Sequence, residues 1–189
     1  MSTQWKGTAE LPKLTKAIFL DRDGVLNVAP VRDGRPLSPM NLSEVVIPPD
    51  VPGALAKLRH HGFRLIMVTN QPNVARGIQS REAVDVINRH LQDQLHLDAT
   101  EMCEHDDVDH CDCRKPKPGM LLRAAARDNI ALVASFLVGD RWRDIEAGRR
   151  AGCRTILLGD GYGEPLPSPP NAVAATLREA ADWILAAKG

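Results

Sequence analysis

Eighteen consecutive residues concentrate much of the reactive chemistry of this sequence. The segment CEHDDVDHCDCRKPKPGM, residues 103–120, holds three of the four cysteines, two of the six histidines and four aspartates, followed by the basic run RKPK. Thiolates and imidazoles bind transition metals, whereas ammonium and guanidinium groups bind anions. We therefore expect the two halves of the segment to serve different chemistry.

The first half has the number and kind of ligands found in a closed tetrahedral Zn²⁺ site. The candidate ligands are Cys103, His105, Cys111 and Cys113. Since zinc with four protein ligands has no open position for water or substrate, we expect a structural metal that orients Arg114 and Lys115. Two alternatives stay open: His110 in place of His105, and a reduced loop without metal. The loop aspartates expected to be merely solvated are Asp106, Asp107, Asp109 and Asp112.

Carboxylates follow two apolar, strand-like runs. KAIFL leads into Asp21 and Asp23, and SFLVG leads into Asp140 and Asp144. In the first pair, one carboxylate suits a nucleophile or metal ligand and the other a general acid and base. Four carboxylates at one sheet edge would repel one another without a hard cation, and oxygen ligands suit Mg²⁺. The alternative for the first pair is an ordinary turn after a strand.

A third apolar run, RLIMVTNQ, ends in hydroxyl and amide groups. Thr69, Asn70 and Gln71 can donate hydrogen bonds to phosphoryl oxygens. Lys115 offers a point charge, and Arg114 offers a planar fork that suits a second phosphate or sugar hydroxyls. The alternative is a solvated basic turn, but the run RKPK precedes a predicted helix N-terminus, which favours anions.

An α/β fold must position these residues. Strand-like runs cover residues 16–20, 63–69, 135–139 and 153–158, and helix patterns cover 49–62, 80–95, 117–129, 144–152 and 171–187. This alternation predicts a parallel sheet with helices on both faces, because parallel neighbours need crossovers of helix length. We expect one domain over residues 1–189, with its core at about 16–158.

Two segments interrupt the alternation. The proline-rich residues 28–48 follow the first strand, at the edge where open α/β sheets bind ligands, and residues 159–170 look like a flexible connector. No insertion is long enough for a full cap domain. We therefore expect the substrate loop, residues 28–40, and the zinc loop, residues 103–113, to close over a substrate.

Composition narrows the class of function. The 24 basic residues balance the 24 acidic ones, so nothing indicates binding to nucleic acid or to an anionic membrane. The sequence has no signal-like apolar region and no apolar run of about 20 residues. We expect a cytoplasmic protein that is a monomer and acts on a small molecule.

Four motifs in order carry a family resemblance. FLDRDGVLN, VTNQ, CRKPKPG and VGDRWRD resemble the motifs of the haloacid dehalogenase (HAD) superfamily of phosphatases. The resemblance implies a Rossmann-like sheet, with Asp21 as a nucleophile that forms an aspartyl phosphate and Asp23 as the general acid and base. It also implies that Thr69 and Lys115 hold the transferring phosphoryl group. The implied Mg²⁺ ligands are Asp21, the backbone carbonyl of Asp23, and Asp140, with Asp144 assisting indirectly.

The zinc loop narrows the resemblance to two groups. C-x-H followed by C-x-C-R-K-P resembles the D-glycero-D-manno-heptose 1,7-bisphosphate 7-phosphatases, which supply nucleotide-activated heptose for lipopolysaccharide or capsule, and the histidinol-phosphate phosphatases. TNQPNVARG and KPKPGM are more similar to the first group, which implies removal of the 7-phosphate. The departures are Arg141 in place of the usual lysine, Asn73, Val74, and residues 28–40.

Arginines are the candidate contacts to the sugar or to a retained phosphate. They are Arg32, Arg76, Arg114 and Arg141, and the alternative for each is an ordinary surface arginine. A function of another class, a zinc-stabilised binding domain without catalysis, also stays open. Since Asp21, Asp23, Lys115 and Asp140 are all present, the sequence shows no sign of lost catalysis.

Overall fold

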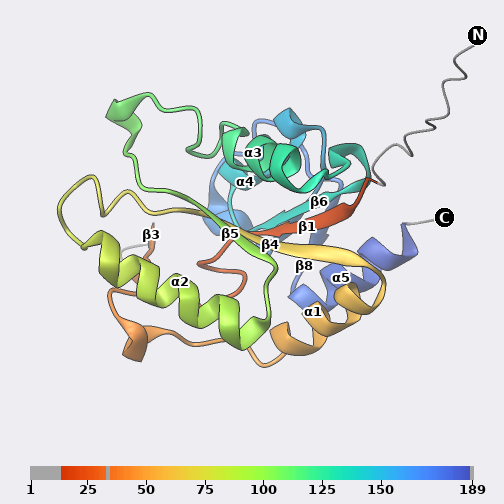
Figure 1. Ribbon diagram of the computed structural model, residues 1–189, viewed down its shortest axis with the longest axis horizontal. Coiled ribbons are helices and arrows are strands. Elements are labelled where there is room, and N and C mark those ends of the chain that lie inside the picture. The colour runs from red at the N-terminus through yellow and green to blue at the C-terminus, as the bar shows by residue number, and fades with distance from the viewer. Residues whose placement is uncertain (1–13, 33–34, 188–189) are drawn as a thin grey trace, which may run out of the picture.

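The fold is built on one parallel β-sheet. A computed structural model describes residues 14–32 and 35–187, and Figure 1 shows the sheet between two layers of helices. In spatial order, the strands are β5 (Ala99–Cys103), β4 (Phe63–Asn70), β1 (Lys16–Leu20), β6 (Phe136–Gly139), β7 (Arg154–Leu158) and β8 (Ala172–Ala174). Every neighbouring pair is parallel, which confirms the predicted α/β class.

Helices cover both faces of the sheet, as parallel crossovers require. One face carries α1 (Val51–His60), α2 (Arg81–Leu95) and α5 (Leu177–Ala186), and the other carries α3 (Gly119–Asp128) and α4 (Trp142–Ala151) (Figure 1). Each face has its own hydrophobic cluster. Strand β1 supplies Ile18 and Leu20 to one cluster and Ala17 and Phe19 to the other, because successive side chains of a strand point to opposite faces.

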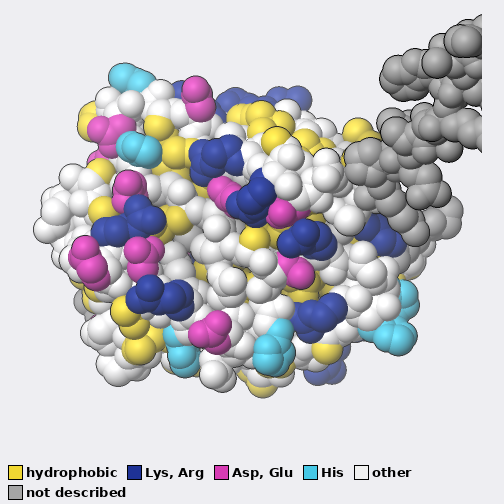
Figure 2. Space-filling view, viewed as in Figure 1, with side chains coloured by type: hydrophobic (Ala, Val, Ile, Leu, Met, Phe, Trp, Pro, Cys, Tyr) yellow, Lys and Arg dark blue, Asp and Glu magenta, His cyan; other side chains and the backbone are white. Residues whose placement is uncertain are grey.

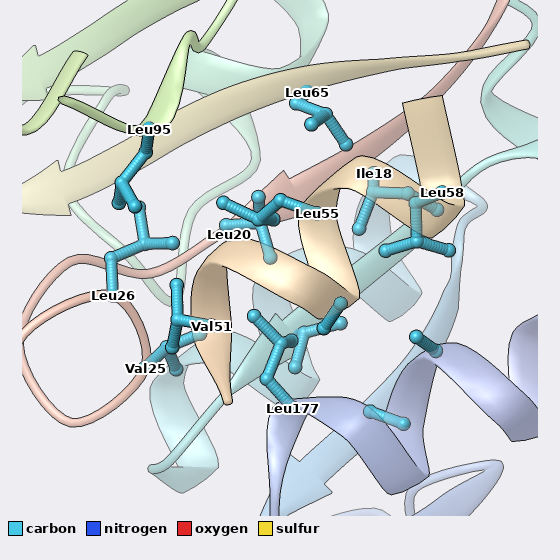
Figure 3. Close-up of a cluster of buried hydrophobic side chains, with 14 of the residues drawn as sticks. Ile18, Leu20, Val25, Leu26, Val51, Leu55, Leu58, Leu65, Leu95 and Leu177 are labelled. Atoms are coloured by element: carbon cyan, nitrogen blue, oxygen red, sulfur yellow. The ribbon is translucent and has the colours of Figure 1, made fainter. Parts of the chain in front are cut away.

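The first cluster fixes β1 against α1 and α5. Figure 3 shows Leu55 and Leu58 of α1 beside Ile18 and Leu20, with Leu177 of α5 below them. All five are at most 2% exposed, and burying a side chain of this size contributes roughly 1.5–3 kcal/mol. This packing holds the end of β1, and therefore the carboxylates that follow it.

The helix predicted over residues 80–95 is confirmed by its cap and its buried stripe. Ser80 Oγ accepts a hydrogen bond from the backbone N–H of Ala83 at 3.2 Å, which satisfies a donor that the helix itself leaves free. Ile87, Leu91 and Leu95 are buried on one side.

The structure differs from the predicted elements in three places. The helix expected over 171–187 begins only at Leu177, because residues 172–174 pair with β7 as an edge strand, which also carries the sheet beyond residue 158. Strand β5 was not predicted because ATEMC is short and half polar. Helix α4 begins at Trp142 rather than Asp144, and Asp144 Oδ2 accepts the backbone N–H of Arg141 at 3.2 Å, as in a capping box.

The segment between β1 and α1 contains a small hairpin. Strand β2 (Val31–Arg32) pairs antiparallel with β3 (Arg35–Pro36), and a 3₁₀ turn follows at Leu42–Glu44. Among its described residues, the segment has no helix or sheet large enough to form a cap domain. The loop that was predicted to face the substrate is therefore a short segment at the carboxyl edge of the sheet, and we call its described residues, 28–32 and 35–40, the strap.

The surface carries mixed charge. Figure 2 shows basic and acidic side chains interspersed over one face of the molecule, in keeping with equal numbers of the two in the sequence. None of the helices described is long and apolar enough to cross a membrane.

Candidate active site

The carboxyl ends of β1, β4 and β6 open into one pocket. The predicted residues that line it are Asp21, Asp23, Thr69, Asn70, Lys115, Asp140, Arg141 and Asp144. The strap adds Pro36, Leu37 and Ser38, and α4 adds Arg143. Because β1 lies between β4 and β6, residues far apart in the sequence meet at this edge.

Lys115 lies at the centre of the charged groups. Its Nζ is 2.8 Å from Asp21 Oδ1 and 2.5 Å from Asp144 Oδ1, and it donates to the Val68 carbonyl at 3.0 Å. Burial lowers the pKa of Lys115, but Asp144 and Asp21 outweigh that effect and raise its pKa above the usual value. The ammonium group therefore favours its charged form, and it must exchange one of these three contacts in order to bind a phosphoryl oxygen.

Asn70 positions this lysine. Its Nδ2 donates to the carbonyl of Lys115, and its Oδ1 accepts the N–H of the same residue, both at 3.0 Å. The sequence predicted that Asn70 donates to phosphoryl oxygens. In the structure its amide fixes the backbone that carries the cation. Asn70 also lines the pocket, so its contact to a phosphoryl oxygen stays a prediction.

The carboxylates next to Lys115 form a site that fits a cation. One oxygen from each of Asp21, Asp140 and Asp144 lies within 4.8 Å of the others, and Asp140 Oδ1 is buried without a hydrogen-bond partner among the described residues. Burial, followed by repulsion between the carboxylates, raises the pKa of Asp21 from 3.8 to about 7 and that of Asp140 to about 8. The raised pKa values show that these carboxylates repel one another when ionised, and a bound cation would offset that repulsion. Since all the ligand atoms are oxygens, the set suits Mg²⁺.

Asp23 is held by donors from separate elements. Arg22 binds it with Nε to Oδ1 at 3.0 Å and Nη2 to Oδ2 at 2.9 Å, and Ser38 Oγ donates to Oδ2 at 2.7 Å. Gln71 Nε2 donates to the same oxygen at 3.1 Å. Arg22 is completely buried and is itself held by Asn88 of α2 at 2.8 Å. The orientation of Asp23 therefore depends on the strap and on α2.

The predicted metal ligands in the loop after β5 also come together. The cluster contains Cys103, His105, Cys111 and Cys113, whose ligand atoms all lie within 4.8 Å of one another. Cys113 Sγ is 3.1 Å from Cys103 Sγ and 3.3 Å from His105 Nδ1. His110 is not part of the cluster. Three thiols and one imidazole in this arrangement are compatible with a tetrahedral zinc site.

The zinc loop is tied to the start of α3. Lys117 Nζ donates to the carbonyls of His110 and Cys111 at 3.1 and 2.7 Å. A Cβ on Gly119 would lie 2.3 Å from the carbonyl oxygen of Asp112, so the contact between α3 and the loop requires glycine here. Lys115 lies between these anchors, and a rigid loop therefore holds it in place.

The predicted substrate arginines differ in their surroundings. Arg141 lines the pocket, and its Nε donates to Glu164 Oε2 at 3.0 Å. Gln71, which was also predicted to contact substrate, is buried, does not line the pocket and donates to Thr69 Oγ1 at 2.8 Å. The side chain of Arg32 lies outside the described residues.

Two of the four loop aspartates hold arginines. The prediction that these aspartates are solvated is confirmed for Asp107, Asp109 and Asp112, which are exposed, and was incomplete for Asp106, which is partly buried. Asp106 accepts from Arg76 Nε at 2.6 Å and Nη2 at 2.7 Å, and these bonds lower its pKa from 3.8 to about 2. Asp107 accepts from Arg114 at 2.8 Å and from Arg143 at 3.1 Å. Arg76 and Arg114 are thereby turned toward the zinc loop and do not line the pocket.

Sequence reasoning missed the contribution of the connector after β7. Tyr162 donates its hydroxyl hydrogen to Asp140 Oδ2 at 2.7 Å, and Glu164 pairs with Arg141. The available signal was its position, since GDGYGE follows a fourth parallel strand and so begins at the same sheet edge as the other motifs.

Comparison with known proteins extends these observations. Residues 112–180 match a family model described as HAD-hyrolase-like. A D-glycero-beta-D-manno-heptose-1,7-bisphosphate 7-phosphatase from Helicobacter pylori (strain J99) is 33% identical over 179 residues, which cover 89% of this chain and 97% of the relative. An enzyme of the same name from Escherichia coli (strain K12) is 35% identical over 188 residues, covering 93% and 91%.

A solved structure gives the same result in three dimensions. The D,D-heptose 1,7-bisphosphate phosphatase from B. bronchiseptica, complexed with magnesium and phosphate, matches with a TM-score of 0.79 and 32% identity over 92% of this chain and 99% of that one. Fold, strand-end carboxylates and these similarities define a HAD phosphatase, which hydrolyses phosphoric monoesters. Within that superfamily, the chain belongs to the heptose-1,7-bisphosphate 7-phosphatase family.

Proposed function

We propose that this protein removes the 7-phosphate of D-glycero-D-manno-heptose 1,7-bisphosphate on the route to nucleotide-activated heptose. The observation that carries the proposal is the ion pair of Lys115 with Asp21, beside the buried free oxygen of Asp140. This geometry supports phosphoryl transfer to a carboxylate. Relatives named for the heptose substrate, at 33% and 35% identity, support its identity.

Asp21 is the proposed nucleophile. Its Oδ1 is occupied by Lys115 and by the backbone N–H of Arg22 at 2.7 Å, which leaves Oδ2 to attack phosphorus. As the bond from Oδ2 to phosphorus forms, the bond from phosphorus to the sugar oxygen breaks and an aspartyl phosphate results. Lys115 and the hydroxyl of Thr69 bind the phosphoryl oxygens, where charge accumulates in the transition state.

Asp23 is the proposed general acid and base. It gives a proton to the departing sugar oxygen, then takes a proton from the water that attacks the aspartyl phosphate. Phosphate leaves and Asp21 is regenerated. The hydrogen bonds from Arg22 and Ser38 hold the carboxylate of Asp23 in one orientation while it exchanges protons with the sugar oxygen and the water.

Mg²⁺ would be held by Asp21, Asp140 and the backbone carbonyl of Asp23, and when bound it supplies positive charge to the transferring phosphoryl group. Asp144 assists indirectly, because Lys115 and the N–H of Arg141 already occupy its two oxygens. The magnesium in the related B. bronchiseptica structure supports this choice of cation.

Zn²⁺ is the proposed occupant of the Cys₃His cluster. With four protein ligands it takes no part in the reaction, and its role is to stabilise the loop that carries Lys115. Residual freedom of the loop would move the ammonium group relative to Asp21.

Arg141 is the proposed contact to the retained phosphate. It is the one predicted substrate arginine, among those whose side chains are described, that lines the pocket. A phosphate bound there must compete with Glu164. Histidinol phosphate has no second phosphate to offer Arg141, so the bisphosphate is the better match to this side chain.

The test is phosphate release with Mg²⁺ from α- and β-heptose 1,7-bisphosphate, histidinol phosphate and fructose 1,6-bisphosphate. One heptose anomer should lead in kcat/KM by orders of magnitude, whereas equally slow turnover of all four would overturn the proposed substrate. Asp21→Asn should abolish release from every ester. Asp128→Asn, the same change in a carboxylate that pairs with Arg127 at the end of α3, should leave activity unchanged.

A further inference from the structure

The two oxygens of Asp140 have different environments. Oδ2 accepts the hydroxyl hydrogen of Tyr162 at 2.7 Å, whereas Oδ1 is buried and has no partner among the described residues. A hydrogen bond to one oxygen fixes the rotation of a carboxylate and decides which oxygen stays available to a cation. In this structure the available oxygen is Oδ1.

The backbone confines the same carboxylate from another side. Gly24, at φ +92°, approaches so closely that a Cβ there would lie 1.7 Å from Asp140 Oδ2. No other residue type leaves that room in this conformation. Oδ2 therefore lies between a glycine and the Tyr162 hydroxyl.

The turn that carries Tyr162 is itself held by two contacts. It has a left-handed backbone, φ 56°, inside the 3₁₀ turn Gly161–Gly163, and Asp160 Oδ1 accepts its N–H at 2.9 Å. Two residues later, Glu164 pairs with Arg141, the residue that follows Asp140. Left-handed non-glycine residues persist where the surrounding structure holds them, often at functional sites.

We infer that Tyr162 is a positioning residue of the cation site, whose hydroxyl turns the carboxylate of Asp140 so that Oδ1 is the oxygen offered to the metal ion. The inference rests on the proposed Mg²⁺ site and is independent of which phosphate ester is the substrate. If the hydroxyl only anchored the connector, its loss would lower stability and leave cation affinity unchanged.

The direct test measures the dissociation constant of Mn²⁺ from the zinc-loaded protein without substrate. The electron paramagnetic resonance signal of free Mn²⁺ gives the unbound concentration in each titration step. Tyr162→Phe keeps the ring and should raise the dissociation constant about tenfold, at the lower end of the effect of such supporting contacts. Thr155→Val is the matched control, because it removes a buried hydroxyl that contacts Asn171 at 3.4 Å near the start of β7. Its affinity should equal that of the wild type.

The two possible failures are distinct. If the wild type binds no Mn²⁺, the proposed metal site is wrong. If the wild type and Tyr162→Phe bind equally well, or the variant binds more tightly, the metal site stands and the inference is overturned. In turnover assays, excess Mg²⁺ should restore kcat of the variant, and a loss that excess Mg²⁺ does not restore contradicts a positioning role.

A second measurement does not depend on the variant folding. Tyr162 is the single tyrosine of the sequence, so 3-fluorotyrosine labelling gives one ¹⁹F resonance from this position. Mg²⁺ should shift that resonance in a saturable way in the wild type and leave it in place in Asp140→Asn. If the wild type binds Mg²⁺ but the chemical shift of the ¹⁹F resonance does not change, the inference is overturned.

Discussion

Without Mg²⁺, the protein should lose stability as the pH rises from about 5 to about 8. Burial and mutual repulsion raise the pKa of Asp21 to about 7 and that of Asp140 to about 8 from a starting value of 3.8. Above pH 4 the unfolded chain has released these protons while the native protein still holds them. Stability therefore falls with pH, since it rises only where the unfolded state binds more protons.

The size of the effect follows from the number of protons. Asp21 and Asp140 repel each other and therefore titrate as a coupled pair. If one proton is counted for the pair, each pH unit costs about 1.4 kcal/mol. The loss between pH 5 and 7 is then about 3 kcal/mol, a large share of the 5–15 kcal/mol typical of a domain. Bound Mg²⁺ favours the ionised carboxylates and should remove most of this dependence.

Urea unfolding measures this directly, with protein dialysed free of Mg²⁺ compared with protein in saturating Mg²⁺. Dialysis is preferable to a chelator, which would also remove the Zn²⁺ proposed for the Cys₃His cluster. Asp140→Asn is the control, because it removes one of the two carboxylates and leaves the pH dependence of the rest of the chain intact. The reasoning fails if the Mg²⁺-free wild type and the control have parallel stability profiles between pH 5 and 8.

Three further perturbations test separate contacts. Lys115→Met leaves Asp21 and Asp144 buried without their cation, so the free energy of unfolding without Mg²⁺ should fall by about 3–5 kcal/mol in urea titrations. The kcat of this variant should fall at least about 100-fold. An unchanged kcat would contradict the proposed role of Lys115 in binding the phosphoryl group. Cys113→Ser should lower zinc below one ion per chain by elemental analysis and lower the melting temperature, and full zinc content would show that the cluster is not the site. Glu164→Gln frees Arg141 from a partly exposed ion pair worth about 0.2–1 kcal/mol. The KM for the bisphosphate should therefore fall by up to about fivefold, while the KM for a monophosphate stays constant. Equal changes in the two KM values would contradict the proposed phosphate contact.

Chain order and periodicity were enough to predict where the main carboxylates lie. Asp21 and Asp140 each follow a short apolar run, and parallel strands bring their carboxyl ends to one edge. The Cys₃His cluster was predictable for a similar reason, since all four ligands come from one short loop whose spacing limits how they can meet.

The supporting contacts were not predictable, because each joins residues whose separation in the sequence carries no pattern. Arg22 reaches Asn88 on α2, and Tyr162 reaches Asp140 from a connector that looks flexible by composition. The contacts of the aspartates in the zinc loop could not be predicted from the sequence either. A run of aspartates is usually solvated, and only the fold brings Asp107 against arginines.

If Asp21 is the nucleophile, an aspartyl phosphate forms at this residue during turnover and can be trapped chemically. Protein quenched with acid during turnover of heptose 1,7-bisphosphate would be reduced with borohydride, which converts an aspartyl phosphate into homoserine, and its peptides analysed by mass spectrometry. Homoserine is expected at position 21, dependent on substrate and absent from Asp21→Asn. Homoserine at another carboxylate, or none under conditions of rapid turnover, would contradict the role of Asp21 as nucleophile.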